Sequence, residues 1–180
     1  MQLAYAHHIR PMRADDLDAV LAVQAACYPP AMQEAAGVVL ARMEAAGDTC
    51  VVVEDGSGVC GYLFAYPSRL GKVTPLGADF EVAEDGDTLY LHDLSVVPRA
   101  HGRGLARGLT GYLLAQARER GLPSSALVSV QDSAGFWAAL GYEPCATDCP
   151  EARAALASYP GDACYMVRAL TAPGALSPSC

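Results

Sequence analysis

The stretch from Thr88 to Arg120 most constrains the fold, because a strand, a glycine-containing turn and a helix follow one another directly. The apolar run Thr88–Val97 predicts a strand, and Pro98 ends its pairing because proline has no amide N–H. Apolar side chains then recur at helical spacing from Gly104 to Arg120, which predicts an amphipathic helix. Such a helix buries its apolar side against a sheet, so this stretch indicates an α/β fold.

Further strands and helices are expected on both sides of this unit. Strands are predicted at Tyr5–Met12, Thr49–Glu54, Val59–Tyr66, Ala126–Val130, Tyr142–Cys145 and Ala163–Leu170, and helices from Asp15 to before Pro29, at Met32–Ala45 and at Ser133–Leu140. The segment 68–87 is rich in Gly, Pro and charge, and we expect a long surface loop, a kind that is usually functional or mobile. No repeat or linker is visible, so we expect one domain over residues 1–172 and a flexible tail over 173–180.

Composition argues against several classes of function. The net charge of −8 disfavours a nucleic-acid partner, since phosphate binding needs a basic face. No apolar run approaches the roughly 20 residues that span a bilayer, and the N-terminus does not fit a signal peptide, so we expect a cytoplasmic protein without a membrane partner. The seven cysteines are scattered, and Cys145 and Cys149 lack a second pair at zinc-site spacing. We therefore expect buried thiols and no metal.

The turn between the strand and the helix suits an anionic ligand. Glycines ahead of a helix N-terminus leave backbone N–H groups unobstructed, and the partial positive charge there favours phosphate oxygens. Arg99 and Arg103 would add to that charge. A tight turn that uses glycine only for its dihedral angles explains the spacing equally well. A P-loop needs Gly-Lys-Ser/Thr where this chain has Gly-Leu-Ala, and a dinucleotide fingerprint needs glycine where Arg107 stands.

Two motifs together resemble a known family. Arg99-x-x-Gly102-x-Gly104 after an apolar strand resembles motif A of the GNAT N-acetyltransferases, in which the pattern is Arg/Gln-x-x-Gly-x-Gly/Ala. The segment Ser133–Tyr142 resembles the family's A-x-x-F-Y-x-x-x-G-F segment, and the resemblance covers about residues 8–146. The strand 91–96 is also reminiscent of the serotonin N-acetyltransferase-like branch. The resemblance implies a mixed, mostly antiparallel sheet that is splayed near its middle, with helices on both faces.

The resemblance also implies a site for acetyl-CoA as co-substrate, with no metal. The backbone of the strand would lie along the pantetheine arm, the amides of the turn would hold the pyrophosphate, and the short helix after position 133 would flank the thiol end. The residues assigned in this way are Leu94, Ser95, Val96, Arg99, His101, Gly102, Arg103, Gly104, Leu105, Ala106, Ser133 and Trp137.

Acetyl transfer to an amine needs a base, since an alkylammonium is no nucleophile until it loses a proton. His92 is our first choice, because an ordinary imidazole titrates near neutrality, and Asp93 is the alternative. Strand alternation places Tyr90, His92 and Leu94 on one face and Asp93 on the other, unless a bulge shifts that parity. A hydrogen-bonded core histidine is an equally good interpretation of His92.

An acid is harder to assign, because Trp137 stands where the family commonly has tyrosine and an indole N–H is no proton-transfer acid. Tyr90 or Tyr28, solvent, or no dedicated acid would complete the mechanism. Tyr28 and Glu34, with the 68–87 loop, are assigned to the acceptor site.

Taken together, these features predict an N-acetyltransferase that moves an acetyl group from acetyl-CoA directly to a primary amine of a small molecule or peptide. The alternative is a non-catalytic acyl-CoA-binding regulatory module, which the tryptophan at position 137 favours. The acceptor stays open, and a homodimer is expected only because such enzymes often associate.

Overall fold

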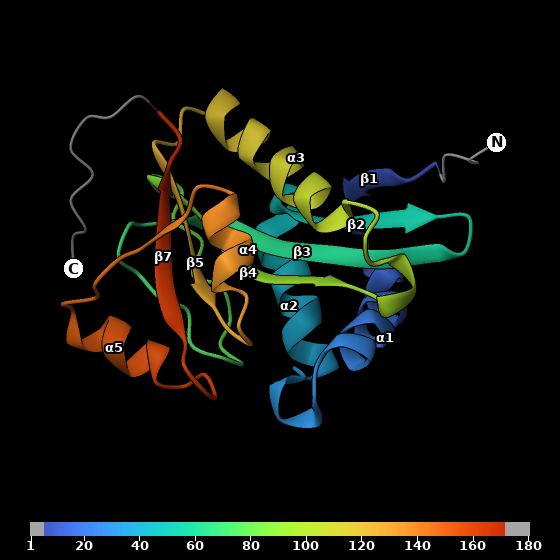
Figure 1. The fold of residues 1–180 in the computed structure, drawn as a ribbon, viewed down its shortest axis with the longest axis horizontal. Helices are drawn as coiled ribbons and strands as arrows, with labels where there is room; N and C mark the ends of the chain where they lie inside the picture. The colour runs from blue at the N-terminus through green and yellow to red at the C-terminus, as the bar shows by residue number, and fades with distance from the viewer. Residues whose placement is uncertain (1–5, 172–180) are drawn as a thin grey trace.

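The computed structural model describes residues 6–171 and contains one seven-stranded sheet with helices on both faces (Figure 1). The strands lie in the order β1-β2-β3-β4-β5-β7-β6, and among them only β4 and β5 pair in parallel. The expected mixed, mostly antiparallel sheet is therefore confirmed. The predicted tail at 173–180 and Tyr5 lie outside the described residues.

Most predicted elements are present within a few residues of their expected bounds. The strands are β1 (His8–Pro11), β2 (Cys50–Asp55), β3 (Gly58–Ser68), β4 (Thr88–Val96), β5 (Ser124–Ser129), β6 (Glu143–Pro144) and β7 (Cys164–Ala169). The helices are α1 (Leu17–Cys27), α2 (Ala36–Ala46), α3 (Leu105–Glu119), α4 (Ala134–Ala139) and α5 (Pro150–Leu156). No element was predicted at α5, which the sequence analysis missed.

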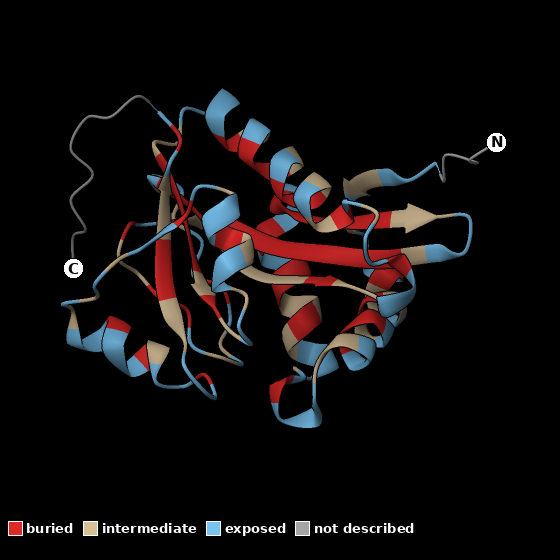
Figure 2. Cartoon of the chain, in the orientation of Figure 1, coloured by how far each residue is buried: buried red, intermediate tan, exposed pale blue. Residues whose placement is uncertain are grey.

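Two apolar layers hold the helices to the sheet. On one face, α1 and α2 pack against the aromatic side chains of β3, in a cluster that includes Val20, Val23, Val39, Met43, Tyr62, Phe64 and Tyr66. On the other face, α3 packs its predicted apolar side on the sheet, in a cluster that includes Leu63, Leu89, Leu91, Leu105, Leu109 and Leu113. Strand β3 lies between the layers and is buried along most of its length (Figure 2).

The second helix begins later than predicted, at Ala36 rather than Met32. Pro30–Met32 form a single 3₁₀ turn, and Gln33 and Ala35 are extended. Between them, the Gln24 side chain holds the backbone of Glu34 on both sides, accepting its N–H at 3.0 Å and donating to its C=O at 3.0 Å. These bonds replace the backbone bonds of a helix, so Glu34 lies in an extended segment.

A β-bulge interrupts β4 at His92. Asp93 pairs with Phe64 and Leu91 pairs with Ala65, so His92 is the additional residue on β4. The bulge shifts the side-chain parity of the strand. His92 and Asp93 consequently lie on the same face as Tyr90, toward α1 and α2, whereas Leu94 packs on the α3 side. The expectation that His92 shares a face with Leu94 and is opposed to Asp93 was therefore wrong.

Close approach of β3 and β4 should make Gly61 intolerant of a side chain. A Cβ at Gly61 would lie 2.8 Å from the Ser95 carbonyl oxygen and 3.0 Å from Val96 Cγ2. We expect Gly61→Ala to lower the free energy of unfolding by about 1–3 kcal/mol, measured by urea denaturation. The matched control is Gly111→Ala in α3, where nothing lies within 4 Å of the added methyl group. It should raise stability by about 0.5–1 kcal/mol, and equal effects at both positions would contradict this interpretation.

Candidate functional site

The sheet opens between β4 and β5. The two strands pair only from Thr88↔Ser124 to Leu91↔Leu127, whereas β5 stays paired with β7 as far as Ser129. In Figure 1, β5 and β7 run steeply across the direction of β3 and β4. The second half of β4 therefore has no partner strand on its β5 side, and the predicted splay is confirmed.

A cavity of about 710 Å³ occupies this opening. Its lining combines the free half of β4, the turn before α3, the end of β5 and one side of α4. Of the residues assigned from the sequence, the cavity is lined by Tyr28, His92, Asp93, Leu94, Val96, His101, Gly102, Gly104, Leu105, Ala106, Ser133 and Trp137. The structure thus brings most of the predicted cofactor residues and the predicted base into one space, but leaves out Ser95, Arg99 and Arg103.

The turn before α3 presents backbone amides to the cavity. Gly102 and Gly104 have φ angles of +74° and +75°, the left-handed region that glycine adopts without strain. The first intrahelical bond runs from the Gly108 N–H to the Gly104 C=O at 2.9 Å, so the amides of 105–107 have no partner within the helix. These amides and the positive end of α3 form a site suited to phosphate oxygens.

His101 differs from its predicted role. Its amide N–H donates to the Pro98 C=O at 3.1 Å within the 3₁₀ turn, so it is not free for a phosphate. Its ring Nε2 lies 2.7 Å from the Val96 carbonyl oxygen, on the half of β4 that does not pair with β5. His101 therefore ties the turn to the strand rather than adding an amide to the anion site.

Asp55 holds the two arginines of the motif. Its Oδ2 accepts bonds from Arg99 Nη1 at 2.9 Å and Arg103 Nη1 at 2.7 Å, and its side chain is only 4% exposed. The Arg103 and Arg99 guanidiniums hold the pKa of Asp55 below its usual range. The carboxylate offsets part of the charge that these arginines were expected to present, and neither arginine lines the cavity. Arg107 does line it, with its guanidinium 5.8 Å from the centre of the Phe136 ring.

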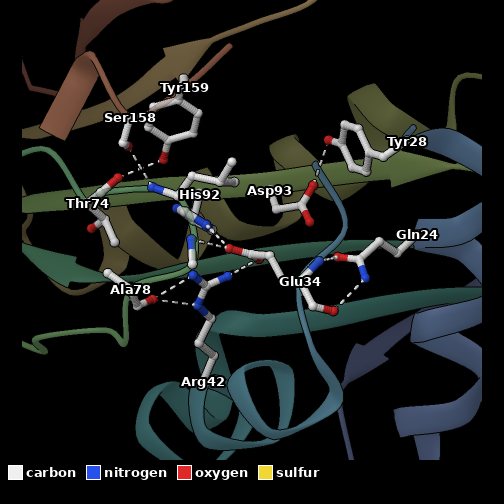
Figure 3. Close-up of polar contacts among 12 residues, drawn as sticks. Gln24, Tyr28, Glu34, Arg42, Thr74, Ala78, His92, Asp93, Ser158 and Tyr159 are labelled. Atoms are coloured by element: carbon white, nitrogen blue, oxygen red, sulfur yellow. Dashed lines mark hydrogen bonds and ion pairs between the residues drawn. The ribbon is translucent and has the colours of Figure 1, made fainter. Parts of the chain in front are cut away.

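His92 lies at the bulge with its two ring nitrogens in different surroundings (Figure 3). Nε2 faces Glu34 Oε1 at 3.6 Å, and Nδ1 is buried with no hydrogen-bond partner among the described residues. The side chain is 2% exposed and lines the cavity. Glu34 was predicted to bind the acceptor, but it does not line the cavity. Its carboxylate instead contacts His92 Nε2 and pairs with the buried Arg42.

Asp93 accepts two tyrosine hydroxyl bonds. Tyr28 donates to Oδ1 and Tyr62 donates to Oδ2, both at 2.7 Å. Burial raises the pKa of Asp93, and the bonds from Tyr28 and Tyr62 oppose that rise. Burial, with Asp93 nearby, also raises the pKa of Tyr28 well above its ordinary value, so its hydroxyl keeps its proton at neutral pH.

Several other predicted residues lie away from the cavity or serve packing. Tyr90 is 1% exposed, packs beside Tyr66 and does not line the cavity. Ser95 is also buried outside the lining. Trp137 lines the cavity but is 7% exposed and packs edge-on against Phe136 and Tyr142. Ser133 Oγ lies 3.0 Å from Ser129 Oγ at the start of α4.

The sequence analysis missed Arg42, Asp55 and Tyr62. Arg42 carried a detectable signal, because it stands beside Met43 and three residues after Val39, on the buried side of α2. Asp55 and Tyr62 carried none, since a turn aspartate and a strand tyrosine are ordinary in such positions.

None of the helices within residues 6–171 has the length and apolar character needed to cross a membrane. No group of three His, Cys, Asp or Glu side chains in the same range is arranged to hold a metal ion.

Comparisons with known proteins bear on the family and on the fold. The sequence model described as "Acetyltransferase (GNAT) family" matches residues 17–142. A comparison of the sequence with curated proteins gives no significant match.

Solved structures share the fold at low sequence identity. The GNAT-like decarboxylase GphF in complex with isobutyryl-CoA has a TM-score of 0.75 and 20% identity, over 91% of this chain and 100% of that one. The ribosomal-protein-S18-alanine N-acetyltransferase from Escherichia coli has a TM-score of 0.65 and 16% identity, over 94% and 97%. Arabidopsis thaliana Naa50, in complex with the bisubstrate analogue CoA-Ac-MVNAL, has a TM-score of 0.62 and 14% identity, over 89% and 96%. The fold is thus shared by a protein described as an N-acetyltransferase, a protein bound to a CoA-containing bisubstrate analogue and a GNAT-like decarboxylase.

The tyrosine bond to Asp93 should stabilise the fold in a pH-dependent way. Tyr28→Phe removes a donor that lowers the pKa of Asp93, so that pKa should rise further. The loss of stability is therefore present while Asp93 is ionised and shrinks as pH falls through its raised pKa. We expect a loss of about 2 kcal/mol at pH 8, decreasing toward pH 4, measured by urea denaturation.

Tyr142→Phe is the matched control, because the Tyr142 hydroxyl pairs with the neutral Ser125 hydroxyl at 2.7 Å. Its loss of about 1 kcal/mol should not vary over the same pH range. A loss of stability in Tyr28→Phe that is constant with pH would show that Asp93 does not change its protonation state over this range, which would contradict the prediction.

Proposed function

Because the chain belongs to the acetyltransferase (GNAT) family, we propose that it moves an acetyl group from acetyl-CoA directly to a primary amine of a small-molecule or peptide acceptor. One observation carries this proposal: a single cavity is lined by the amide-rich start of α3 and by His92, Asp93 and Tyr28. The amides at the start of α3 suit a pyrophosphate. The side chains of His92, Asp93 and Tyr28 suit the proton transfers that accompany attack of an amine on an acyl carbon.

The cofactor end of the cavity fits coenzyme A by its chemistry. Unpaired amides at the start of α3 offer donors to the pyrophosphate oxygens. The half of β4 that has left β5 offers backbone groups to the amides of the pantetheine arm, in the manner of an added strand. Apolar side chains of Leu91, Leu127 and Trp137 would surround the thioester end.

At the reacting end, His92 is the proposed base. Its Nδ1 is buried and has no partner among the described residues, so it would take a proton from the acceptor ammonium through one bridging water. The amine nitrogen would then attack the thioester carbonyl carbon. As the C–S bond breaks, the nitrogen loses its second proton. One of the two protons ends on the departing thiolate and the other is released to solvent. An imidazolium can supply the proton that the thiolate takes up, since it is ordinarily a stronger acid than a thiol by about two pKa units.

Tyr28 is the proposed hydroxyl donor to the thiolate. It lines the cavity, unlike Tyr90, and Trp137 has no acidic proton to give. Its raised pKa makes full proton transfer to a thiolate unfavourable. Tyr28 would instead turn its one hydroxyl proton from Asp93 Oδ1 to the leaving sulfur and stabilise it by a hydrogen bond, while Tyr62 keeps its bond to Asp93. The protein would act in the cytoplasm on a diffusible acceptor.

Binding of the cofactor is tested by titrating acetyl-CoA and CoA into the protein by calorimetry. We expect a dissociation constant on the order of micromolar for the wild type. A Gly102→Glu, Gly104→Glu double variant should lose this binding, because it places two carboxylates where the pyrophosphate would lie. The control Gly111→Glu adds a carboxylate on the same helix, in open space, and should bind normally. A wild type that does not bind CoA would contradict the proposal, provided circular dichroism shows it folded.

Catalysis is tested with His92→Gln, which keeps a polar side chain but removes the base. Against a panel of arylalkylamines, polyamines, amino acids, aminoglycosides and peptides, kcat should fall by about 10²–10⁴-fold. Affinity for acetyl-CoA should stay within about twofold, since Nδ1 is assigned no role in cofactor binding. For comparison, His101→Gln should change the KM for acetyl-CoA more than kcat. Binding of CoA with no turnover of any amine would favour the alternative, a non-catalytic acyl-CoA-binding module.

A further inference from the structure

Arg42 is a fully buried cation beneath the site. Its side chain is 1% exposed and forms an ion pair with Glu34, which is 6% exposed. It also donates to the Ala78 carbonyl oxygen from Nε at 3.1 Å and stacks over Phe80 at 4.8 Å. A buried ion pair contributes little net stability compared with apolar packing, because both charges must leave water. Its presence here therefore calls for a role beyond stability.

Both carboxylate oxygens and the backbone of Glu34 are held by neighbouring groups (Figure 3). Oε2 pairs with Arg42, and Oε1 accepts the Gly77 N–H at 2.9 Å. The Gln24 side chain fixes the backbone of Glu34 through two bonds of 3.0 Å. The one further neighbour of Oε1 among these contacts is His92 Nε2, at 3.6 Å.

This arrangement selects one tautomer of His92. With the proton on Nε2, an N–H points at a carboxylate oxygen, which is favourable. With the proton on Nδ1, the Nε2 lone pair would face the carboxylate lone pairs across a buried gap, which is unfavourable. Nδ1, which has no partner among the described residues, is then left bare in a side chain that lines the cavity.

We propose that Glu34 and Arg42 are positioning residues: Glu34 keeps the proton of His92 on Nε2, so that Nδ1 is the basic atom, and Arg42 fixes Glu34 in the orientation that does so. The assignment of Nδ1 as catalytic base rests on the proposed function, but the tautomer does not. The 69–87 loop takes part, since Gly77 and Ala78 hold the carboxylate and the guanidinium in place.

The charges around His92 are consistent with this role. The groups that face it are Glu34 before α2, Arg42 on α2, Asp93 and Tyr90 on β4, and, across Glu34, Tyr159 after α5. Burial alone would raise the pKa of Glu34, but His92 and Arg42 outweigh it and bring that pKa to about 2. Glu34 is thus ionised at any pH at which an amine acetyltransferase would work, and it also stabilises the imidazolium formed in the reaction.

The decisive variant is Glu34→Gln, which keeps the shape and removes the charge. Both carboxylate oxygens accept bonds, from Arg42 at Oε2 and from the Gly77 N–H at Oε1. The charged Arg42 requires an oxygen more strongly than Gly77 does, so the glutamine NH₂ should take the Oε1 position, lose the Gly77 bond and donate toward His92. The proton of His92 should then move to Nδ1. The matched control is Glu81→Gln on the 69–87 loop, where Glu81 pairs with Lys72 and its side chain is 80% exposed.

The tautomer is read from imidazole ¹⁵N shifts in the CoA-free protein, with His92 assigned by His92→Gln. We expect a protonated Nε2 and a bare Nδ1 in the wild type and in Glu81→Gln, and the reverse in Glu34→Gln. In the same variant, kcat should fall on the order of a hundredfold, and the acidic limb of the pH–kcat profile should move to lower pH. Glu34→Asp, which keeps the charge, should retain the wild-type tautomer and part of the activity.

A wild type protonated on Nδ1, or a Glu34→Gln protein with unchanged ¹⁵N shifts, would overturn the inference. If Glu34→Gln fails to fold, the wild type and Glu34→Asp decide the question by their tautomers. The spectra need neither CoA nor an amine. The expected tautomers in a protein that acetylates nothing would therefore support the positioning of His92 while refuting the proposed function.

Discussion

Strand β5 pairs with β7 along its whole length but with β4 only as far as Leu91↔Leu127, and the rest of the site depends on that difference. Beyond this point the twist of the β5–β7 pair carries it away from β4, which remains bonded to β3. If β5 had stayed paired with β4, no cavity would form between them, and the backbone groups on that edge of β4 would be hydrogen-bonded to β5. The opening leaves strand backbone, helix amides and the bulged residue His92 facing one space.

The bulge then decides which side chains meet. Without it, His92 and Asp93 would point to opposite faces of the sheet; with it, both lie on the side of α1 and α2. Their partners come from segments far apart in the chain: Tyr28 follows α1, Glu34 precedes α2, and Tyr62 lies on β3. Each buried carboxylate is matched by donors, as burial requires. His92 Nδ1 is buried without a hydrogen-bond partner among the described residues, and our mechanism uses it as the base.

Much of this fold could be predicted because its signals are local. The amphipathic pattern of α3, the glycines before it and the apolar run of β4 each report on neighbouring residues in the chain, and all three were placed within a residue or two. Helix α5 was missed because it has only seven residues, begins at Pro150 itself and has only Ala152 and Ala155 buried. Arg99 and Arg103 were predicted to hold the cofactor, but their pairing with Asp55, 44 and 48 residues away in the chain, has no local signal.

The sequence alone predicted a mixed α/β sheet and a glycine-containing turn between an apolar strand and the next helix. Spacing and residue type suffice for those features because they depend on backbone geometry over a few residues. The assignment of His92, Asp93 and Tyr28 to one site also used the resemblance to a family. Only the tertiary structure decided that His92 and Asp93 share a face, that Glu34 backs the imidazole instead of meeting an acceptor, and that Arg42 holds it there. Those contacts depend on strand register and on loops that meet in space, and neither is encoded in a local pattern.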